Sequence, residues 1–545
     1  MPLRVARVSW RLLLLGFLFL VCATGLIGRL AHLQIVSHGH YAVEAEDEHL
    51  GIEKVLPPRG AILDRNGFPL ALTLDAYDIF IDRKAWQDEE RARKGAEALS
   101  PLLNRAPEEI RSALGPETEG DYLLAGGLDY DLGQKIVALG LPGVKASPTL
   151  KRFYPEGDLA SGLLGFLGRD KVGLAGLEAD LQQELGGVPG TLYFERDSLG
   201  NPIPFGYRRL EKSQPSADVK LTIDRYIQRV AEQQLDATIE KQGASGGTII
   251  VMDPNTGAIL AMASRPSFKL SDLNLNDEGR MELYRNRAVT DLYEPGSVMK
   301  VVTMATAVDL GVITPNTTYV DTGLASVPGG EIVNWDFSVN GLTTMTQVLQ
   351  KSLNTGAVWV SQQIGPERFY EYIKRFGFGE LTHVGLGGEA AGEVRTSDDP
   401  EWYPVDLATN SFGQGISVTP LQMITAVATI ANGGQLVQPY IVQEVVGPQE
   451  NRVFKPVAVR RVISESTART LRGMMQEVVE GNPSHLAHVP GYRVAGKTGT
   501  SYISVGGGYA PDITIASFVG FVPADDPQMI VLIKIDKPQN ETLGG

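Results

Sequence analysis

The chain has 545 residues, which corresponds to three or four domains of about 150 residues each. Hydrophobic residues make up 43% and charged residues 21%, which is ordinary for packed globular protein and excludes a disordered chain. The net charge of −15 argues against a nucleic-acid-binding protein, because binding phosphate requires basic patches. The single cysteine, Cys22, excludes internal disulfides and cysteine-built metal sites. The seven histidines lack metal-ligand spacing, so we expect no metal and no cofactor.

The first predicted element is a membrane anchor. Residues 12–28 form an uncharged apolar run, which at 17 residues is at the short end for one helical span of a bilayer. Three arginines precede the run and acidic residues follow it at 44–48, so the positive-inside rule keeps the N-terminus in the cytoplasm and exports the rest. A cleaved signal peptide is the alternative, because Val21-Cys22-Ala23 weakly resembles a cleavage site, but apolar character continues to Ile35. We expect an uncleaved, single-pass anchor in the cytoplasmic membrane.

The next stretch, residues 51–217, is predicted to form a region of short elements. Asn66-Gly67 between apolar flanks is a strong hairpin signal, because both residues tolerate positive φ. Residues 87–116 have the pattern of short amphipathic helices, and Pro107 opens the second of them. Residues 171–212 are rich in glycine and other turn-forming residues, which indicates a loop-rich end to this region.

A further region is predicted to begin near Asp218. Residues 219–224 resemble a strand and residues 226–239 have helical spacing. Two antiparallel hairpins are predicted, one from strands at 248–252 and 258–263 and the other from strands at 513–522 and 529–535. Helical patterns fill the interval between them, at residues 298–310, 346–363, 367–376 and 420–431. This order indicates an α+β domain whose helices pack on an antiparallel sheet.

Ser297 and Lys300 form the first candidate site, where a turn runs into a helical pattern. Three positions apart at the start of a helix, they share one face, so the amine can reach the hydroxyl. A serine hydroxyl is a poor nucleophile until a base takes its proton, and lysine can do this only where burial or nearby charge favours its neutral form. Alone the pattern is weak, and the alternative is a helix start with a solvated lysine.

Two further motifs carry polar side chains suited to proton transfer and substrate binding. In one, Ser352 could relay a proton and Asn354 could hold a substrate amide, although the motif alone also fits a polar turn or a helix surface. In the other, Lys497-Thr498-Gly499-Thr500 lies on or after a strand-like stretch. A strand edge there could form main-chain hydrogen bonds with an extended peptide.

Residues 491–498 also match the phosphate-binding loop pattern G-x-x-x-x-G-K-[ST] letter for letter. That loop requires a strand before it and a helix after it. Residues 484–491 do not resemble a strand, and residues 501–511 cannot form a helix because they are rich in glycine. We therefore reject a nucleotide-binding interpretation.

Taken in chain order, Ser297 with Lys300, Ser352 with Asn354, and Lys497-Thr498-Gly499 resemble the three signatures of penicillin-recognising serine enzymes. The wider sequence narrows the resemblance to class B penicillin-binding proteins. Their membrane-proximal pedestal is matched by Arg59-Gly60 with residues 64–67, by residues 152–155 and by residues 173–178. Residues 411–415 and 419–422 resemble the division-specific members. The resemblance covers about residues 8–540, and its motifs are jointly very specific.

The resemblance implies an α+β fold with an N-terminal transmembrane helix, an elongated α+β pedestal and a penicillin-binding or β-lactamase-like transpeptidase domain. That domain is an antiparallel sheet with helices on both sides. The expected divisions are a cytoplasmic tail at 1–11, a transmembrane anchor at 12–28, a linker at 29–50, a pedestal at 51–217 and a transpeptidase domain at 218–545. The family usually continues into a segment and helix that cover the sheet, whereas ten residues follow Ile535 here. We expect either a truncated chain or a cover from elsewhere.

The activity implied by the resemblance is that of an extracytoplasmic peptidoglycan D,D-transpeptidase. Ser297 would attack the D-Ala-D-Ala carbonyl of a donor stem peptide, with Lys300 as the base and Ser352 as the proton shuttle toward the leaving amine. Asn354 would hold the peptide amide. Lys497, Thr498 and Thr500 would orient the substrate carboxylate, with Gly499 in the same substrate-binding strand. Main-chain N–H groups of Ser297 and Thr500 would form the oxyanion hole.

The resemblance also implies the partners. These are nascent or lipid-linked stem peptides, β-lactams that trap Ser297, the membrane, a polytopic glycan polymerase and other division proteins, but no nucleic acid. An elongation-type class B transpeptidase and a non-catalytic assembly scaffold remain as alternatives. A β-lactamase is disfavoured because such enzymes lack a pedestal of roughly 170 residues.

Overall fold

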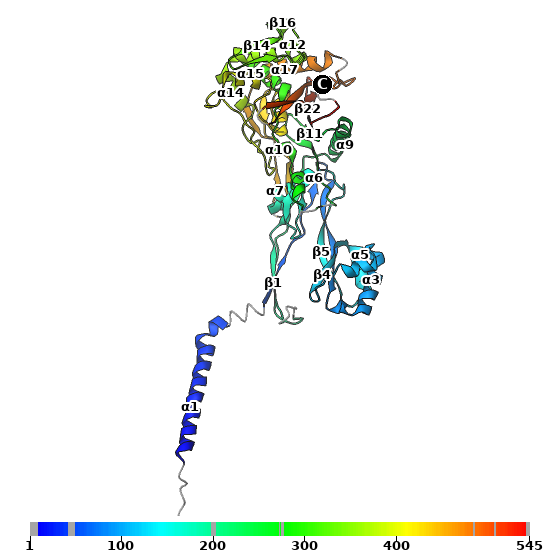
Figure 1. Cartoon of the computed structure of the whole chain (residues 1–545), viewed down its shortest axis with the longest axis vertical. Helices are drawn as coiled ribbons and strands as arrows, with labels where there is room; N and C mark the ends of the chain where they lie inside the picture. The colour runs from blue at the N-terminus through cyan, green and yellow to red at the C-terminus, as the bar shows by residue number, and fades with distance from the viewer. Residues whose placement is uncertain are drawn as a thin grey trace, which may run out of the picture. The chain divides into compact units, whose positions relative to one another are not determined.

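The computed structural model describes residues 9–41, 50–197, 203–271, 273, 277–448, 450–482, 485–505 and 508–540. The chain divides into two compact units, whose elements are labelled in Figure 1. One unit contains the chain up to Pro57 together with Gly187–Pro215, and the other contains Pro58–Gly186 together with the chain from Ser216 onward. The stretch expected as the pedestal therefore contributes to both units.

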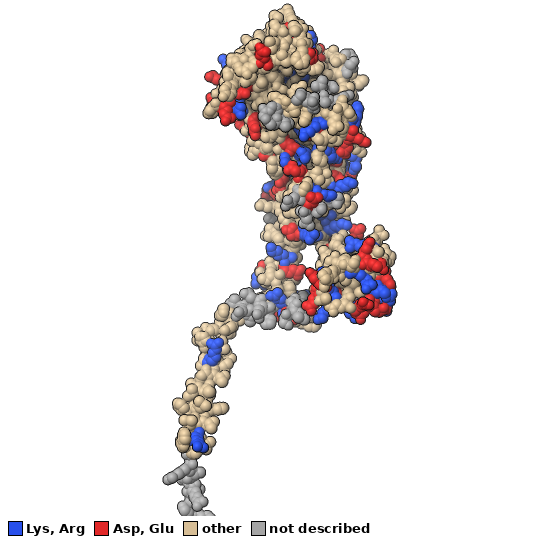
Figure 2. All heavy atoms as spheres, viewed as in Figure 1, with Lys and Arg blue, Asp and Glu red and all other residues tan. Residues whose placement is uncertain are grey.

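The first unit carries the apolar helix. Helix α1 (Trp10–Ala31) continues into a short π-helix, η1 (His32–Val36). Together they form a 27-residue span with a mean hydropathy of 2.2, long and apolar enough to cross a membrane. None of its apolar stretch is buried against protein, and Figure 2 shows basic side chains toward its two ends with an uncharged stretch between them. The predicted apolar helix is confirmed, and it is longer than the predicted run because the apolar pattern continues past Arg29.

A three-stranded antiparallel sheet completes the first unit. Its strands are β1 (Leu50–Val55), β8 (Gly190–Glu195) and β9 (Arg208–Glu211), in that order. Leu50 pairs with Glu195, and Phe194 pairs with Arg208. The start of β1 therefore lies at the same end of the sheet as the connection between β8 and β9.

The second unit contains a seven-stranded sheet built around the long strand β3 (Pro69–Asp82). Strands β2 (Ile62–Leu63), β4 (Asp121–Asp129) and β5 (Val144–Phe153) all pair with β3. Helices α3 (Glu89–Leu103), α4 (Pro107–Ser112) and α5 (Tyr130–Ala138) share a small apolar core with it. The predicted Asn66-Gly67 turn joins β2 to β3, with Gly67 at φ 87°. Both helices predicted within 87–116 are present, with Pro107 in the first turn of the second.

The same sheet extends into the chain beyond residue 218. Strand β10 (Asp218–Leu221) pairs in parallel with β2 and antiparallel with β18 (Val442–Val446), which pairs with β19 (Asn451–Val453). The order is β19-β18-β10-β2-β3-β4, with β5 on β3. One sheet therefore contains strands from both sides of the expected boundary at residue 218.

A buried ion triad lies beside this sheet and unites the three pedestal motifs. The carboxylate of Glu178, with no exposed side-chain surface, lies between two arginines. Its Oε2 is 2.5 Å from Nε of Arg59, and its Oε1 is 2.7 Å from Nε of Arg152. Arg59 also donates to the main-chain oxygen of Glu178, and Arg152 to that of Gly60. Segments separated by more than one hundred residues are thus joined through one carboxylate.

A second sheet, five-stranded and antiparallel, has the order β12-β11-β23-β22-β21. Its strands are β11 (Gly246–Met252), β12 (Ile259–Arg265), β21 (Ala495–Val505), β22 (Gly508–Val522) and β23 (Met529–Asp536). Helix α9 (Arg225–Gln242) packs against one face through Leu235, as Figure 1 shows beside β11. Helices α11 (Met299–Asp309) and α16 (Pro420–Ala431) belong to the large core on the other face. Both predicted hairpins and the helices on two sides of an antiparallel sheet are confirmed.

Beside α9, the outer face of this sheet is open. A hollow of about 750 Å³ is lined mainly by apolar residues of β22, β23 and the segment 485–494, among them Phe518, Val531 and Ile533. After β23 the chain turns toward the end of α9, where the N–H of Gln539 donates to the main-chain oxygen of Gln242. Within the described residues, no helix lies where the resemblance implies a cover.

The helical middle of the chain follows the predicted pattern in part, with one predicted helix broken in two and two helices missed. The helix predicted over 346–363 is two helices, α12 (Met345–Gln350) and α13 (Asn354–Ile364). Ser352 has φ 54°, in the left-handed region, and Leu353 is extended, so the α-helix cannot continue through them. Helices α14 (Pro366–Arg375) and α16 agree with prediction, whereas α15 (Pro404–Asn410) and α17 (Glu465–Glu480) were missed.

Shorter elements complete the second unit. Between α11 and α12, strand β13 (Thr318–Asp321) pairs with β16 (Gly341–Thr344), and β14 (Leu324–Val327) pairs with β15 (Gly330–Val333). The others are η2 (Ala85–Gln87), α6 (Ser161–Leu164), β6 (Phe166–Leu167), β7 (Gly173–Ala175), α7 (Gly176–Asp180), α8 (Gln182–Gly186), η3 (Glu278–Tyr284), α10 (Arg287–Thr290), η4 (Gly296–Val298), β17 (Gln435–Val437) and β20 (Ala458–Arg461).

Candidate active site

Ser297 lies in the 3₁₀ turn η4, which leads directly into α11. Gly296 has φ 55°, and a Cβ at that position would lie 2.4 Å from the main-chain oxygen of Thr500. A Cβ on Gly413 would lie 2.2 Å from the main-chain oxygen of Gly296. Only glycine fits at these two positions, so the turn that carries Ser297 is held tightly between β21 and the loop at Gly413.

Lys300, at the start of α11, is fully buried and surrounded by oxygen atoms. Its Nζ lies 3.0 Å from Oγ of Ser297 and 2.8 Å from Oδ1 of Asn354. The same Nζ is 2.6 Å from the main-chain oxygen of Ser352 and 3.3 Å from its Oγ. The predicted contact between amine and hydroxyl is present, and the alternative of a solvated lysine is wrong.

Burial lowers the pKa of Lys300 well below its usual value, and the neighbouring charge of Lys497 lowers it further. The neutral form of the amine is therefore favoured. A neutral amine at this distance can accept the proton of the Ser297 hydroxyl, which is the condition for making a serine nucleophilic.

The break between α12 and α13 positions the second motif. Positions two apart on a continuous helix point in different directions, so an unbroken helix would separate Ser352 from Asn354. With the left-handed turn at Ser352, both residues contact the amine of Lys300. The Nδ2 of Asn354 also donates to the main-chain oxygen of Val333 at 3.0 Å, which fixes the orientation of its amide.

The third motif lies in β21. Lys497 is buried, its Nζ donates to the main-chain oxygen of Thr498 at 3.1 Å, and burial lowers the pKa of Lys497 to about 7. Thr498 and Thr500 are half-buried. A Cβ on Gly499 would lie 2.8 Å from the main-chain oxygen of Pro295, so the glycine lets β21 approach the turn of Ser297. All eight predicted site residues thus lie on three segments that meet at one place.

The position of Lys497 inside β21 also shows that residues 491–498 do not form a phosphate-binding loop. Where that loop requires a helix after the lysine, β21 continues and is followed by β22. The rejection of a nucleotide-binding loop is confirmed. Among the described residues, no group of three or more histidine, cysteine or acidic side chains is placed to hold a metal ion.

Sequence reasoning missed a buried carboxylate behind Asn354. Asp321, at the end of β13, accepts hydrogen bonds from the Nδ2 groups of Asn334 and Asn340 at 3.0 and 2.8 Å, and from Oγ1 of Thr355 at 2.8 Å. Its carboxylate also accepts from the main-chain N–H groups of Gly323 and Asn340. These contacts hold the chain between β15 and β16 against the start of α13. The Asp-Thr-Gly sequence at 321–323 was an available turn signal, but no local pattern links the other donors.

Glu294, three residues before Ser297, was also not predicted as a site residue. Its Oε1 accepts from the N–H of Gly415 at 2.9 Å and from the hydroxyl of Tyr509 at 3.0 Å. Burial raises the pKa of Glu294. The carboxylate ties the turn of Ser297 both to the 411–415 loop and to β22.

Comparison with known proteins places the chain among relatives of one kind. Residues 247–545 match the family model of the penicillin-binding protein transpeptidase domain, and residues 54–221 match that of the penicillin-binding protein dimerisation domain. Stage V sporulation protein D of Bacillus subtilis (strain 168) is 35% identical over 98% of this chain and 83% of the relative. Peptidoglycan D,D-transpeptidase FtsI of Escherichia coli (strain K12) is 32% identical over 98% of this chain and 88% of the relative.

The chain is also similar in fold to solved structures of penicillin-binding proteins. Penicillin-binding protein 2X from Streptococcus thermophilus aligns with a TM-score of 0.76 at 26% identity, covering 90% of this chain and 78% of that one. Penicillin-binding protein 3 from Mycobacterium tuberculosis, complexed with aztreonam, aligns with a TM-score of 0.69 at 29% identity, covering 90% and 93%.

The fold and the meeting of the three motifs define a serine acyltransferase of the penicillin-recognising kind. With its preceding dimerisation domain and its relatives, the chain belongs to the class B penicillin-binding proteins, the peptidoglycan D,D-transpeptidases.

Proposed function

We propose that this chain cross-links stem peptides in septal cell-wall synthesis and that β-lactam antibiotics inhibit it by acylating Ser297. The observation that carries the proposal is the fully buried amine of Lys300 at 3.0 Å from Oγ of Ser297. The septal role is supported by the resemblance of residues 411–422 to division-specific members and by relatives named FtsI. The alternatives to this function are a role in cell elongation and a non-catalytic scaffold, and the experiments described below distinguish them from septal cross-linking.

Acylation begins when Lys300 takes the hydroxyl proton and Oγ of Ser297 attacks the carbonyl carbon of the penultimate D-alanine. The oxygen of that carbonyl becomes negative and accepts hydrogen bonds from the main-chain N–H groups of Ser297 and Thr500, which stabilise the charge. The C–N bond to the terminal D-alanine then breaks. Its nitrogen receives a proton by way of Ser352, which contacts Nζ of Lys300, and D-alanine leaves.

The second half of the reaction reverses these proton transfers. An amino group of a second stem peptide attacks the acyl-serine carbonyl and loses a proton to the Lys300–Ser352 pair. The ester bond to Oγ of Ser297 breaks, Oγ recovers a proton, and a new amide joins the two peptides. Asn354 holds the donor amide. The substrate carboxylate is oriented by Lys497, Thr498 and Thr500, which lie in the same substrate-binding strand as Gly499.

We also propose the division of the chain into a cytoplasmic tail at 1–11, an anchor at 12–28, a linker at 29–50, a pedestal at 51–217 and a transpeptidase domain at 218–545. The N-terminus is cytoplasmic and the catalytic domain extracytoplasmic. The proposed partners are lipid-linked or nascent stem peptides, a polytopic glycan polymerase and other division proteins. The support is the arginine-flanked apolar helix together with the family resemblance.

Mass spectrometry after incubation with a fluorescent penicillin tests the enzymatic proposal. We expect a covalent adduct on the peptide that contains Ser297 and none in Ser297→Ala. An adduct that persists in Ser297→Ala, or no adduct on the native chain, would overturn the assignment and favour the scaffold. Rapid hydrolysis of the drug would indicate a β-lactamase instead. For the septal role, a fluorescent fusion should gather at the division site, and uniform labelling of the side wall would favour elongation.

The rate of acylation at low penicillin concentration is expected to fall as the pH rises through about 7. Lys497, with a pKa of about 7, is positively charged below this pH and neutral above it, and the charged form attracts the drug carboxylate. At saturating drug the decline should move to higher pH, because a bound carboxylate stabilises the ammonium. Stopped-flow fluorescence across about pH 5 to 9, a range of about two units on either side of this pKa, measures both limits. In Lys497→Arg the decline should be absent, since arginine remains charged; an unchanged decline would contradict the assignment.

Replacing Asp321 with asparagine is expected to slow acylation about tenfold, or about 1.4 kcal/mol. The amide would present an NH₂ group to donors that now face a carboxylate, and the start of α13 would lose its fixed position. If Asp321 acts through Asn354, the same substitution should cause no further loss in an Asn354→Ala background. Equal losses in both backgrounds would indicate general destabilisation instead. The exposed Asp336→Asn on the same segment is the control and should leave the rate unchanged.

A further inference from the structure

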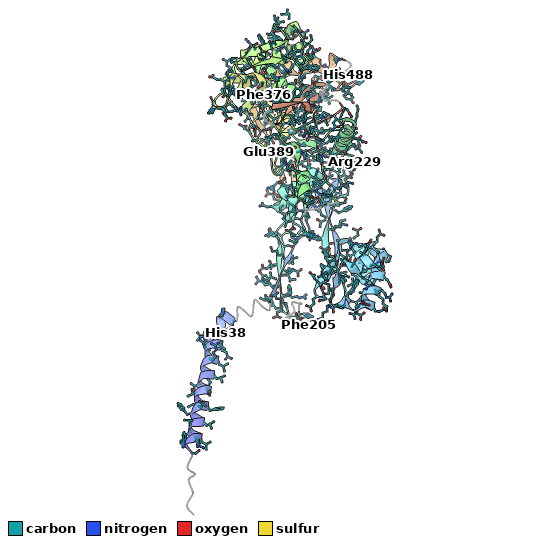
Figure 3. The ribbon with its side chains drawn as sticks, viewed as in Figure 1. His38, Phe205, Arg229, Phe376, Glu389 and His488 are labelled. Carbon is teal, nitrogen blue, oxygen red and sulfur yellow. The ribbon has the colours of Figure 1, made fainter. Side chains whose placement is uncertain are left out.

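The connection between β8 and β9 in the first unit presents apolar side chains to solvent. Phe205 is fully exposed, and Ile203 and Tyr207 are 40% and 52% exposed. Figure 3 shows Phe205 at the end of the hairpin. Arg208 follows directly and is also exposed. We call these four residues the hairpin tip. An aromatic ring with no protein contact is a feature of interaction sites on soluble domains and of segments that contact membranes.

The sheet register places the hairpin tip at the end of the sheet where the chain arrives from the apolar helix. Leu50, the first residue of β1, pairs with Glu195, the last residue of β8. Only eight residues separate Leu50 from Tyr41, the last described residue before β1. Covalent geometry limits that distance to about 30 Å. The end of the sheet that carries the hairpin tip is therefore joined to the apolar helix by a short tether, which keeps it within a few tens of ångströms of the end of that helix.

The side chains of the hairpin tip have the chemistry of a membrane interface. Phe205 and Ile203 gain from burial among acyl chains, and Tyr207 suits the boundary where one end of the ring is apolar and the other hydrated. Arg208 can bind the phosphates of anionic lipids. Two acids of the flanking strands have local partners: Oε2 of Glu195 accepts from the N–H of Tyr207, and Glu211 pairs with Arg209 at 2.9 Å. The tip therefore offers apolar groups and a cation to the bilayer.

We propose that the hairpin tip contacts the outer leaflet of the membrane that the apolar helix spans. Phe205 and Ile203 lie at the boundary between headgroups and acyl chains, and Arg208 binds a lipid phosphate. This inference rests on the membrane anchoring and orientation proposed above. Two attachments to one bilayer, the helix and the hairpin tip, limit the rotation of the first unit about the end of its anchor.

The single cysteine of the chain makes a direct test possible. The full chain is reconstituted in vesicles of phosphatidylcholine and phosphatidylglycerol, with Cys22 replaced by serine and an environment-sensitive fluorophore on Pro204→Cys. We expect lipids with a quencher on the acyl chain to reduce the fluorescence at position 204 by about twofold. The same fluorophore on Tyr226→Cys, an exposed aromatic position on α9, should be quenched only by aqueous iodide.

A second variant and an internal reference separate the possible outcomes. Phe205→Ser combined with the label at 204 should abolish quenching by lipid, because the inserting side chain is gone. In the native sequence, a fluorophore on Cys22 reports whether the apolar helix is in the bilayer. Lipid quenching at Cys22 but not at 204 would overturn the inference while leaving the anchoring intact, whereas aqueous quenching at Cys22 would refute the anchoring itself. Shielding at 204 that appears only when a membrane protein partner is added would also overturn it, in favour of a protein contact.

Discussion

Replacing Lys300 with methionine is expected to reduce the rate of acylation by penicillin about 10²–10⁴-fold, the range for removal of a general base. The chain should nevertheless remain folded. Methionine has a similar length and no charge, so it can fill the buried space of Lys300, although the oxygen atoms of Ser352 and Asn354 lose a hydrogen-bond donor. We expect the melting temperature to fall by no more than a few degrees, because the loss of these hydrogen bonds is small compared with the stability of the whole domain. The decrease in rate should occur in the acylation step itself. Stopped-flow measurement at saturating penicillin measures that step separately from binding.

Two controls make this prediction specific. Lys300→Arg keeps the positive charge but cannot lose its proton, so it should be as slow as the methionine variant. Lys374→Met replaces an exposed lysine on α14 and should leave the rate unchanged. Near-native acylation in Lys300→Met would show that another group activates Ser297. Near-native acylation in the arginine variant alone would show that the charge, not proton transfer, is what matters.

Removing the carboxylate of Glu178 by substitution with alanine is expected to lower the free energy of unfolding by about 3–5 kcal/mol. The change leaves the guanidinium groups of Arg59 and Arg152 buried together without their counter-ion, and each would repel the other. It also opens a cavity between α7 and the sheet of β3. Chemical denaturation of the native chain and the variant, followed by fluorescence, measures the difference.

The exposed pair of Glu97 with Arg93 supplies the matched control. It has the same chemistry, but both side chains are about half exposed, so Glu97→Ala should change stability by less than about 1 kcal/mol. Exchanging all three members of the buried triad for apolar residues of similar volume should recover much of the loss, because no isolated charge remains. A loss below about 1 kcal/mol in Glu178→Ala would contradict the role assigned to the carboxylate.

Local signals were sufficient where structure is decided by nearby residues. The Asn66-Gly67 turn, the helix opened by Pro107 and the two hairpins of the five-stranded sheet were all predictable, because turn chemistry and alternating side chains act over a few positions. The three motifs of the site were predictable for a related reason. Each is a short run of residues, and their order along the chain matched a known set.

Features that depend on distant residues were not predictable in this way. Nothing in the sequence around Ser352 signals a left-handed conformation, since serine rarely adopts it and the surrounding pattern is helical. The helix breaks between α12 and α13, and this break lets both Ser352 and Asn354 contact the amine of Lys300, a residue about fifty positions away in the sequence. The network of Asp321 and the membership of β10 in the seven-stranded sheet likewise join residues that no local window contains.

The place of β10 between β2 and β18 affects how the protein folds while it is being synthesised. Ribosomes build chains from the N-terminus, so β2 at residue 62 is made long before β10 at residue 218 and β18 at residue 442. The sheet cannot close until more than four-fifths of the chain exists, and closing such distant pairings is slow. Once residue 221 has been made β10 can pair with β2, but the other edge of β10 stays open until β18 has been made. We therefore expect a nascent chain of this protein to be prone to aggregation until this edge is covered.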